Sequence, residues 1–226
     1  MLMARRRTLY LPALLGTLVA AVLMACAVAL STLSEKAEAT FPGKNGRIAY
    51  SGYDGNDYEI YTINSRGGDK IQVTNNNTDD YSPSYSPRAK RIAYVGYDRN
   101  DAEIYTINAG GGGKTQLTHN NNDEFAPDYS PDGKNIVYAG LEGLERNNAE
   151  SDIYKIKVGG GAKRKLTHNK YDTYPSYSPN GKKIAYTVSK GSTGGDIYTI
   201  NAFGGGKTKV AHNTTDEAAP SWGSRP

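Results

Sequence analysis

Cysteine is almost absent from this chain, and helix-forming runs are absent from most of it. The single cysteine, Cys26, lies in an apolar N-terminal stretch, so a domain that begins after it has no disulfide. After residue 40 there is no long stretch of helix-forming residues. The 26 Gly and 18 Tyr, with few aliphatic residues, are typical instead of a turn-rich, all-β protein stabilised by packing and strand pairing.

The chain also has no large excess of positive or negative residues. The formal net charge is +4, and half of it belongs to residues 1–39, so the rest of the chain is nearly balanced. A nucleic-acid-binding face needs clustered Lys and Arg, so we expect no nucleic-acid partner. No Gly-x-Ser-x-Gly motif occurs, and no cysteine nucleophile follows residue 39. The sequence therefore nominates no catalytic residue.

The N-terminus has the pattern of an export signal. Arg5–Arg7 precede an apolar run, Leu9–Leu33, and Ala37–Ala39 form a small-x-small cleavage pattern. We interpret residues 1–39 as a signal peptide that is cleaved after its last alanine. This leaves a domain at residues 40–226, placed outside the cytoplasm in the periplasm, the cell envelope or the extracellular space.

Other interpretations of the N-terminus also place residues 40–226 outside the cytoplasm. The apolar run is long enough to stay uncleaved as a membrane anchor helix. Leu23–Cys26 loosely resembles a lipoprotein box, although the residues after Cys26 stay apolar, and Arg6–Arg7 is a weak twin-arginine match. Any contact with a membrane is expected only through this segment.

A repeated motif dominates the rest of the chain. Pro-x-Tyr-Ser-Pro occurs three times and a truncated Pro-Ser-Trp copy follows, so that the first prolines lie 44, 48 and 45 residues apart. Periods of about 40 to 45 residues are typical of propeller blades. The longer step holds an insertion, Leu141–Ser151. The copies are Pro83–Pro87, Pro127–Pro131, Pro175–Pro179 and Pro220–Trp222.

Each repeat contains four strand signals bounded by Gly, Asn and Asp, which is the pattern of an antiparallel meander. Glycine runs such as Gly110–Gly113 supply the positive φ that a hairpin turn needs. Lysines on the fourth strand protect an outer edge from aggregation. In one repeat the predicted strands are Pro83–Pro87, Arg91–Val95, Glu103–Ile107 and Lys114–Thr118.

The two ends of the domain look complementary. It begins with a second strand, Gly46–Tyr50, and ends with a first strand, Pro220–Trp222. Pairing them, with Trp222 beside Ile48, would close a β-propeller of four four-stranded blades by a three-plus-one strand latch and remove its free edges. The alternative is that the four blades form half of a larger, self-associated ring.

These motifs resemble the WD40-like repeat of the TolB-type β-propellers (PD40). Pro127–Tyr138, Asp152–Tyr154 and Lys165–Thr167 carry the resemblance, which covers residues 45–224. It implies the propeller fold. It implies less about activity, because such blades serve envelope interaction proteins, propeller halves of peptidases and other secreted proteins. TolB resembles a six-bladed propeller preceded by an α/β domain, to which nothing in this sequence corresponds.

One carboxylate stands three residues before the first proline of each copy. In a closed propeller these four residues would meet near one mouth of the channel, where Ca²⁺ could bind their oxygens. The interpretation that we favour is that each one caps a crossover through hydrogen bonds. The residues are Asp80, Glu124, Asp172 and Glu217.

Two further sets suggest metal ligands. The histidines His119, His168 and His212 occupy equivalent places in their repeats, so they are spread around the rim and cannot share one ion. Asp54–Asp57 with Glu59, and Asp98–Asp101 with Glu103, resemble fragments of calcium loops but lack the complete ligand series. For these two hairpins we favour plain Asx turns.

The sequence thus favours a secreted or envelope-associated binding or scaffold module for a protein or carbohydrate, either monomeric or self-associated. Exposed loop aromatics are typical interface anchors, although packing between blades would use tyrosine equally well. The alternative function is a secreted hydrolase with a metal at the channel mouth. The candidate partner-binding residues are Tyr53, Tyr58, Tyr81, Tyr97 and Tyr171.

Overall fold

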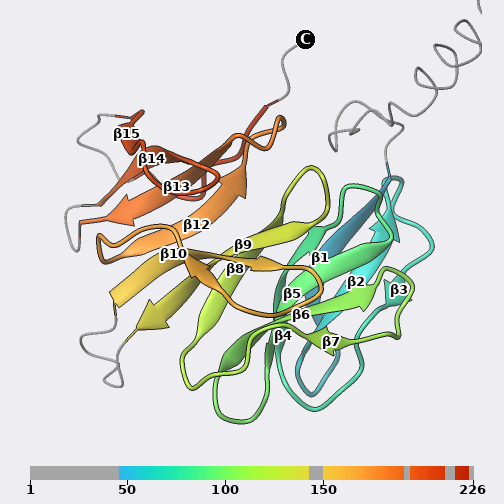
Figure 1. Ribbon diagram of the computed structural model, residues 1–226. Helices are drawn as coiled ribbons and strands as arrows, with labels where there is room; N and C mark the ends of the chain where they lie inside the picture. Colours follow the sequence, from blue (N-terminus) through green and yellow to red (C-terminus); the bar gives the residue numbers. More distant parts are fainter. Residues whose placement is uncertain (1–45, 143–149, 191–193, 212–216, 224–226) are drawn as a thin grey trace, which may run out of the picture. The chain divides into compact units, whose positions relative to one another are not determined.

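The computed structural model describes residues 46–142, 150–190, 194–211 and 217–223 (Figure 1). The predicted signal or anchor segment, residues 1–39, lies outside these ranges, as does His212. Within the described ranges, no helix is long and apolar enough to cross a bilayer.

The described residues form antiparallel β-sheets, which confirms the all-β blades that the repeats predict. The sheet orders are β1-β2-β3, β4-β5-β6-β7, β8-β9-β10-β11 and β12-β13-β14-β15, and we number the blades one to four in this order. The strands are β1 (Arg47–Tyr53), β2 (Tyr58–Asn64), β3 (Ile71–Gln72), β4 (Asp80–Tyr85), β5 (Arg91–Tyr97), β6 (Ala102–Asn108), β7 (Thr115–Gln116), β8 (Glu124–Tyr129), β9 (Asn135–Glu142), β10 (Glu150–Lys157), β11 (Arg164–Lys165), β12 (Asp172–Tyr177), β13 (Lys183–Ser189), β14 (Gly195–Asn201) and β15 (Thr208–Lys209).

Each fourth strand lies where the sequence predicts it but spans only two residues. The glycine turn before it folds back against the end of the preceding strand. At Gly113, with φ +64°, a Cβ would lie 2.7 Å from the Asn108 side chain. Only glycine fits there, since it lacks the Cβ and tolerates the left-handed conformation.

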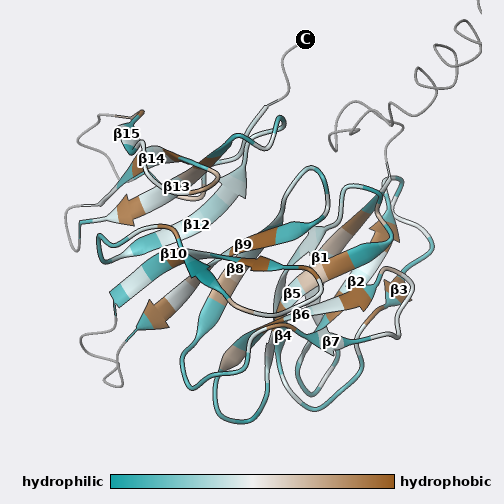
Figure 2. Ribbon diagram, viewed as in Figure 1, coloured by the Kyte–Doolittle hydropathy of each residue, from teal (hydrophilic) through white to brown (hydrophobic). Residues whose placement is uncertain are grey.

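The second strands bury both faces, as their alternating apolar residues predict. In β9, Ile136 and Tyr138 belong to a core cluster shared with blade two, whereas Val137 and Ala139 belong to one shared with blade four. A third cluster joins blades one and two. Figure 2 shows apolar stretches along the strands and hydrophilic loops between them. Consecutive blades therefore stack face to face.

Tyrosine pairs reinforce the middle of each blade. Tyr94 of β5 lies opposite Tyr105 of β6, and their stacked rings are 5.6 Å apart. Tyr138 and Tyr154 repeat the arrangement at 5.7 Å in blade three. Cross-strand aromatic pairs of this kind stabilise a sheet and fix its register.

The predicted ring closure is wrong for the described residues. Among them β2 alone pairs with β1, so blade one has three strands, and Ile48 is 54% exposed. Residues 217–223 contain no strand, and the Trp222 indole N–H instead donates a hydrogen bond to the Ser176 carbonyl, 3.0 Å away. The last motif copy therefore packs beside blade four and does not complete blade one.

This last copy nevertheless keeps the backbone shape of an inner strand. Each inner strand has an irregularity at the residue before its first proline, where φ is 53° at Ser82, 52° at Ala126 and 49° at Tyr174. Ala219, before Pro220, has φ 51°. The motif thus keeps the same positive-φ conformation before its first proline even where no strand pairs with it.

The four motif copies surround one hollow of about 140 Å³. Its lining includes the aromatic residue of every copy, namely Tyr85, Tyr129, Tyr177 and Trp222. Asp128 links three of these inner strands, since its carboxylate accepts hydrogen bonds from Ser84 Oγ at 3.2 Å and Tyr177 N at 2.8 Å. Burial raises the pKa of Asp128 to about 6.

We predict that Asp128→Asn stabilises the protein at pH 8 and has little effect at pH 4. A carboxyl group whose pKa is raised on folding stabilises the fold while it is protonated, and loses this contribution as the pH rises through about 6. Asparagine resembles the protonated form and keeps an oxygen for the Tyr177 N–H. Thermal unfolding at both pH values tests this, and Asp132→Asn on the nearby turn is the control. An Asp128→Asn protein less stable than wild type at pH 8 would contradict the prediction.

Candidate functional site

Exposed tyrosines gather where the first two blades meet. The rings of Tyr53 and Tyr58 are 5.5 Å apart, and those of Tyr58 and Tyr81 are 5.1 Å apart. Tyr53 is 61% exposed and Tyr58 is 40% exposed, while Tyr81 is half-buried beneath them. Tyr97 ends β5 on the next hairpin and is 42% exposed. We call these four residues the tyrosine patch.

Hairpin and crossover geometry position this patch. Tyr53 ends β1 and Tyr58 begins β2, so the two rings flank one turn and pair across it. The Tyr58 N–H donates to Asp79 Oδ1 at 2.9 Å, which ties this hairpin to the crossover that enters β4. Burial, with Asp79 beside it, raises the pKa of Tyr81 to about 12. Tyr171 is 49% exposed but belongs to the crossover between blades three and four.

The predicted channel-mouth carboxylates begin the inner strands. Asp80, Glu124 and Asp172 are all fully buried at the first residue of β4, β8 and β12. A crossover asparagine donates to each: Asn76 Nδ2 lies 2.8 Å from Asp80 Oδ2, and Asn120 Nδ2 lies 2.7 Å from Glu124 Oε1.

The third bond of this kind joins Asn169 to Asp172 at 3.2 Å. Glu217 is partly buried, and its N–H donates to the Gly195 carbonyl at 3.2 Å. The described residues contain two groups of three carboxylates whose oxygens lie within 4.8 Å of one another, and neither group includes Asp80, Glu124, Asp172 or Glu217. That these four bind Ca²⁺ stays a prediction.

A second buried carboxylate stands next to the first in the third strand of each repeat, which is β2 in blade one, β6 in blade two, β10 in blade three and β14 in blade four. Glu59 and Glu103, both fully buried, accept hydrogen bonds from the backbone N–H of Asn76 and Asn120. In blade three Asp152 does the same for Asn169, at 3.0 Å. The crossover asparagine therefore holds two carboxylates, one through its N–H and one through its side chain.

These paired carboxylates affect one another. Burial raises the pKa of Glu124 to about 8, and the neighbouring Glu103 carboxylate adds to the effect. Burial likewise raises the pKa of Asp80 to about 7, with Glu59 contributing. Both directions follow from placing two acidic groups together in a medium that solvates charge poorly.

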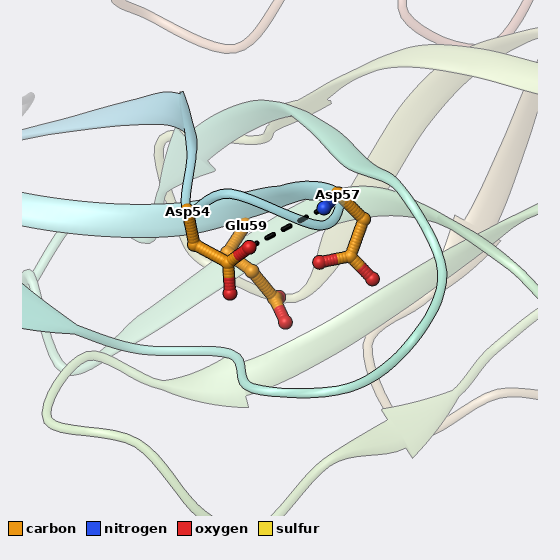
Figure 3. A group of neighbouring side chains, drawn as sticks. All are labelled: Asp54, Asp57 and Glu59. Carbon is orange, nitrogen blue, oxygen red and sulfur yellow. Dashed lines mark hydrogen bonds between the residues drawn. The ribbon is translucent and has the colours of Figure 1, made fainter.

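Two hairpins add more carboxylates to this arrangement. Oxygens of Asp54, Asp57 and Glu59 lie within 4.8 Å of one another, and Figure 3 shows the three carboxylates facing a common space. The predicted Asx turn is confirmed, since Asn56 N donates to Asp54 Oδ1 at 2.8 Å. This bond lowers the pKa of Asp54, whereas burial and Glu59 raise that of Asp57.

The same set recurs in blade two, with Asp98, Asp101 and Glu103. Asn100 N donates to Asp98 Oδ1 at 3.0 Å, so this turn is also of the Asx type. Burial, followed by the charge of Glu103, raises the pKa of Asp101 to about 6. Sequence reasoning noticed both hairpins but missed how close the turn aspartates come to the third-strand glutamate.

In blades three and four the third-strand carboxylate has a lysine partner. Lys165 Nζ lies 2.8 Å from Asp152 Oδ2, and Lys209 Nζ lies 2.7 Å from Asp196 Oδ2. Lys190 also pairs with Asp196, at 2.5 Å. The sequence reading assigned the fourth-strand lysines to edge protection alone and missed this neutralising role. Aligning the outer strands against the third strands would have revealed it.

The two described histidines lie on the surface of separate blades. His119 follows β7 and His168 follows β11, and both are exposed. This agrees with the expected spread around the rim.

Comparison with known proteins identifies the repeat. The family model described as the TolB beta propeller domain (PD40) matches residues 29–225. A putative TolB from Agrobacterium tumefaciens has a TM-score of 0.63 and 26% identity, over 71% of this chain and 59% of that one. The chain therefore spans about three fifths of the length of that relative. No curated protein is similar enough to count as a match.

Enzymes share the fold as well. Hydrazine synthase from Kuenenia stuttgartiensis gives a TM-score of 0.61 at 14% identity, over 74% of this chain and 32% of that one. Oligogalacturonate lyase from Vibrio parahaemolyticus gives 0.57 at 12% identity, over 72% of this chain and 48% of that one. At these identities the likeness shows the fold alone.

We predict that Lys165→Gln destabilises blade three by roughly 1–3 kcal/mol. The substitution leaves Asp152, which is 2% exposed, without its cation. The cost should be smaller than the about 3–5 kcal/mol of a fully buried pair, because a quarter of the Lys165 side chain is exposed. Chemical denaturation measures the effect. Lys157→Gln, at an exposed site of β10, is the control and should change stability little.

Proposed function

The chain belongs to the family of TolB beta propeller domains, and from this premise we propose that residues 40–226 form a protein-interaction module of the cell envelope. The blades act as a rigid scaffold, and the tyrosine patch is the surface that contacts the partner. Because the chain spans only part of the length of its TolB relative, the role of that whole protein is not carried over.

The clustering of exposed tyrosines is the observation that carries this proposal. Tyr53, Tyr58 and Tyr97 expose large ring surfaces on neighbouring hairpins, and the half-buried Tyr81 supports Tyr58 from below. Tyrosine is an effective interface anchor because its ring buries apolar area at a small entropic cost while its hydroxyl remains able to hydrogen-bond. A carbohydrate could stack on the same rings, but their spread over two blades suits a protein surface better.

The envelope location rests on the sequence. Arg5–Arg7, the apolar run Leu9–Leu33 and the small residues Ala37–Ala39 together predict export, whether or not the segment is cleaved. The alternative of a hydrolase with a metal at the channel mouth has weaker support. One oxygen each of Asp80, Glu124 and Asp172 accepts from a crossover asparagine, and the other oxygen has no hydrogen-bond partner among the described residues. These three carboxylates do not, however, belong to a group of three close enough to share one ion in the described ranges.

We predict that the double variant Tyr53→Ala, Tyr58→Ala keeps its fold but binds its partner at least tenfold more weakly. The test replaces Tyr97 by a photo-crosslinking amino acid in the native cell and compares the crosslinked species with and without the double substitution. Phe203→Ala removes another aromatic ring, 72% exposed at a distant turn, and should leave the crosslinks unchanged. Identical crosslinks in the double variant and in wild type would rule out the patch.

We further propose that the exposed edge of blade one supports self-association. The backbone of β1 has no partner on one side among the described strands, and such an edge readily accepts another strand. Residues 217–223 of a second copy have the inner-strand sequence that this edge lacks.

Light scattering on residues 40–226 is therefore expected to show an assembly larger than a monomer. Ile48→Lys should shift it toward the monomer, because a charge at an edge strand disfavours strand addition. Val210→Lys, at a site of similar exposure, should not. A strictly monomeric wild-type chain would overturn the proposal.

A further inference from the structure

Among the described residues, which leave out 143–149 of blade three and 191–193 of blade four, only the first two blades hold a cluster of three neighbouring carboxylates. Two aspartates of the hairpin turn and the glutamate of the third strand bring their oxygens within 4.8 Å of one another (Figure 3). A fourth carboxylate anchors each hairpin, because Asp79 accepts from Tyr58 N and Asp123 accepts from Ala102 N, each at 2.9 Å. The clusters are Asp54, Asp57 and Glu59 in blade one, and Asp98, Asp101 and Glu103 in blade two.

Several of these oxygens are enclosed and have nothing to bind. Asp57 is 8% exposed and Asp101 is 5% exposed, and neither carboxylate accepts a hydrogen bond from any described residue. Glu103 is fully buried, and its Oε2 is equally unpartnered within the described ranges. Buried polar atoms are nearly always satisfied in folded proteins, so repeated exceptions at equivalent positions require an explanation.

The repeats themselves supply the comparison. In blades three and four a lysine of the outermost strand lies opposite a tyrosine of the neighbouring strand: Lys165 opposite Tyr154, and Lys209 opposite Tyr198. These lysines neutralise Asp152 and Asp196. At the same register, blade one has Gln72 opposite Tyr61, and blade two has Gln116 opposite Tyr105. The blades that lack this ammonium group are the ones whose hairpins add two aspartates.

We propose that blades one and two each bind a divalent cation, Ca²⁺, which takes the place of the lysine ammonium group of blades three and four. Three carboxylates supply an all-oxygen set, which suits a hard cation. Ca²⁺ accepts six to eight oxygens in flexible geometry, so water can complete its shell, whereas Mg²⁺ demands a near-ideal octahedron. Zn²⁺ sites generally use His or Cys, which neither cluster contains.

Each ion would hold its hairpin against the neighbouring crossover. Asp57 and Glu59 flank Tyr58, the central ring of the tyrosine patch, so an ion bound between them would fix the backbone that presents this ring. The site would therefore order the proposed partner surface, but its occupancy can be measured without any partner. Affinities of extracellular calcium modules, with Kd of about 10⁻⁴–10⁻³ M, set the expected range.

Isothermal titration of the full chain with CaCl₂, in mild detergent after removal of metal with EGTA, should show two sites per chain. Gln116→Lys and Gln72→Lys should each remove one site, and the double variant should remove both, because they install the ammonium group of the other blades. Thr115→Lys adds the same charge at the adjacent residue of β7, whose side chain points to the opposite face, and should leave both sites intact.

Thermal unfolding separates metal binding from a purely structural role. The wild-type unfolding temperature should rise by roughly 5 °C in millimolar Ca²⁺, and by much less in Mg²⁺ at equal ionic strength. In EGTA, Asp101→Asn should unfold no earlier than wild type, since its oxygens have no partner to lose, and its rise with Ca²⁺ should be smaller.

Three results would overturn the proposal. One is the absence of heat with Ca²⁺ together with an unchanged unfolding temperature. Another is an equal rise with Mg²⁺ that persists in the Gln72→Lys, Gln116→Lys double variant, because this would show charge screening alone. The third is an Asp101→Asn protein that is destabilised in EGTA while its calcium response is unchanged, because this would assign the carboxylate to structure.

Discussion

Each blade of this protein must accommodate a buried carboxylate in its third strand, and the neighbouring structure depends on how that charge is compensated. Glu103 shows the arrangement: its Oε1 accepts the backbone N–H of Asn120, whose side chain then binds Glu124 of the next inner strand. Burying a charge without such partners costs several kcal/mol. The interaction therefore fixes where one blade ends and the next begins.

The buried carboxylate is neutralised differently in the two halves of the chain, and this difference points to a candidate function. Asp152 and Asp196 are neutralised by lysines of their own blades, which completes the electrostatics within the protein. Blades one and two share the fold and the asparagine crossover but replace that lysine by glutamine. Asp54 and Asp98 are accounted for by the Asx turns that they form, whereas the carboxylates of Asp57 and Asp101 have no hydrogen-bond partner among the described residues. The proposed cation would supply the partner that these two carboxylates lack.

Much of the fold could be predicted from the sequence because the same strand pattern recurs in every repeat of a propeller. The spacing of the Pro-x-Tyr motif, the alternation in β9 and the glycine turns gave the strands, their order and the faces that they bury. Closure could not be predicted in this way. Complementary strand patterns show that Trp222 and β1 can belong to one sheet, but not that they pair within one chain. Blade four instead offers Trp222 a hydrogen bond, and the indole lines the hollow that the four motif copies share.

The candidate sites were less predictable, for a related reason. Individual residues could be named, as Tyr53 and Asp57 were, but their proximity depends on the twist of a hairpin and the path of a crossover that starts some twenty residues later. Asp79, which holds the Tyr58 N–H, illustrates this dependence. This one hydrogen bond positions the hairpin that carries both the aromatic ring and the carboxylates. The proposed partner surface and the proposed cation site therefore depend on the same contact. Substitutions that loosen this support should therefore weaken both, whereas the lysine exchanges at Gln72 and Gln116 act on the charge alone.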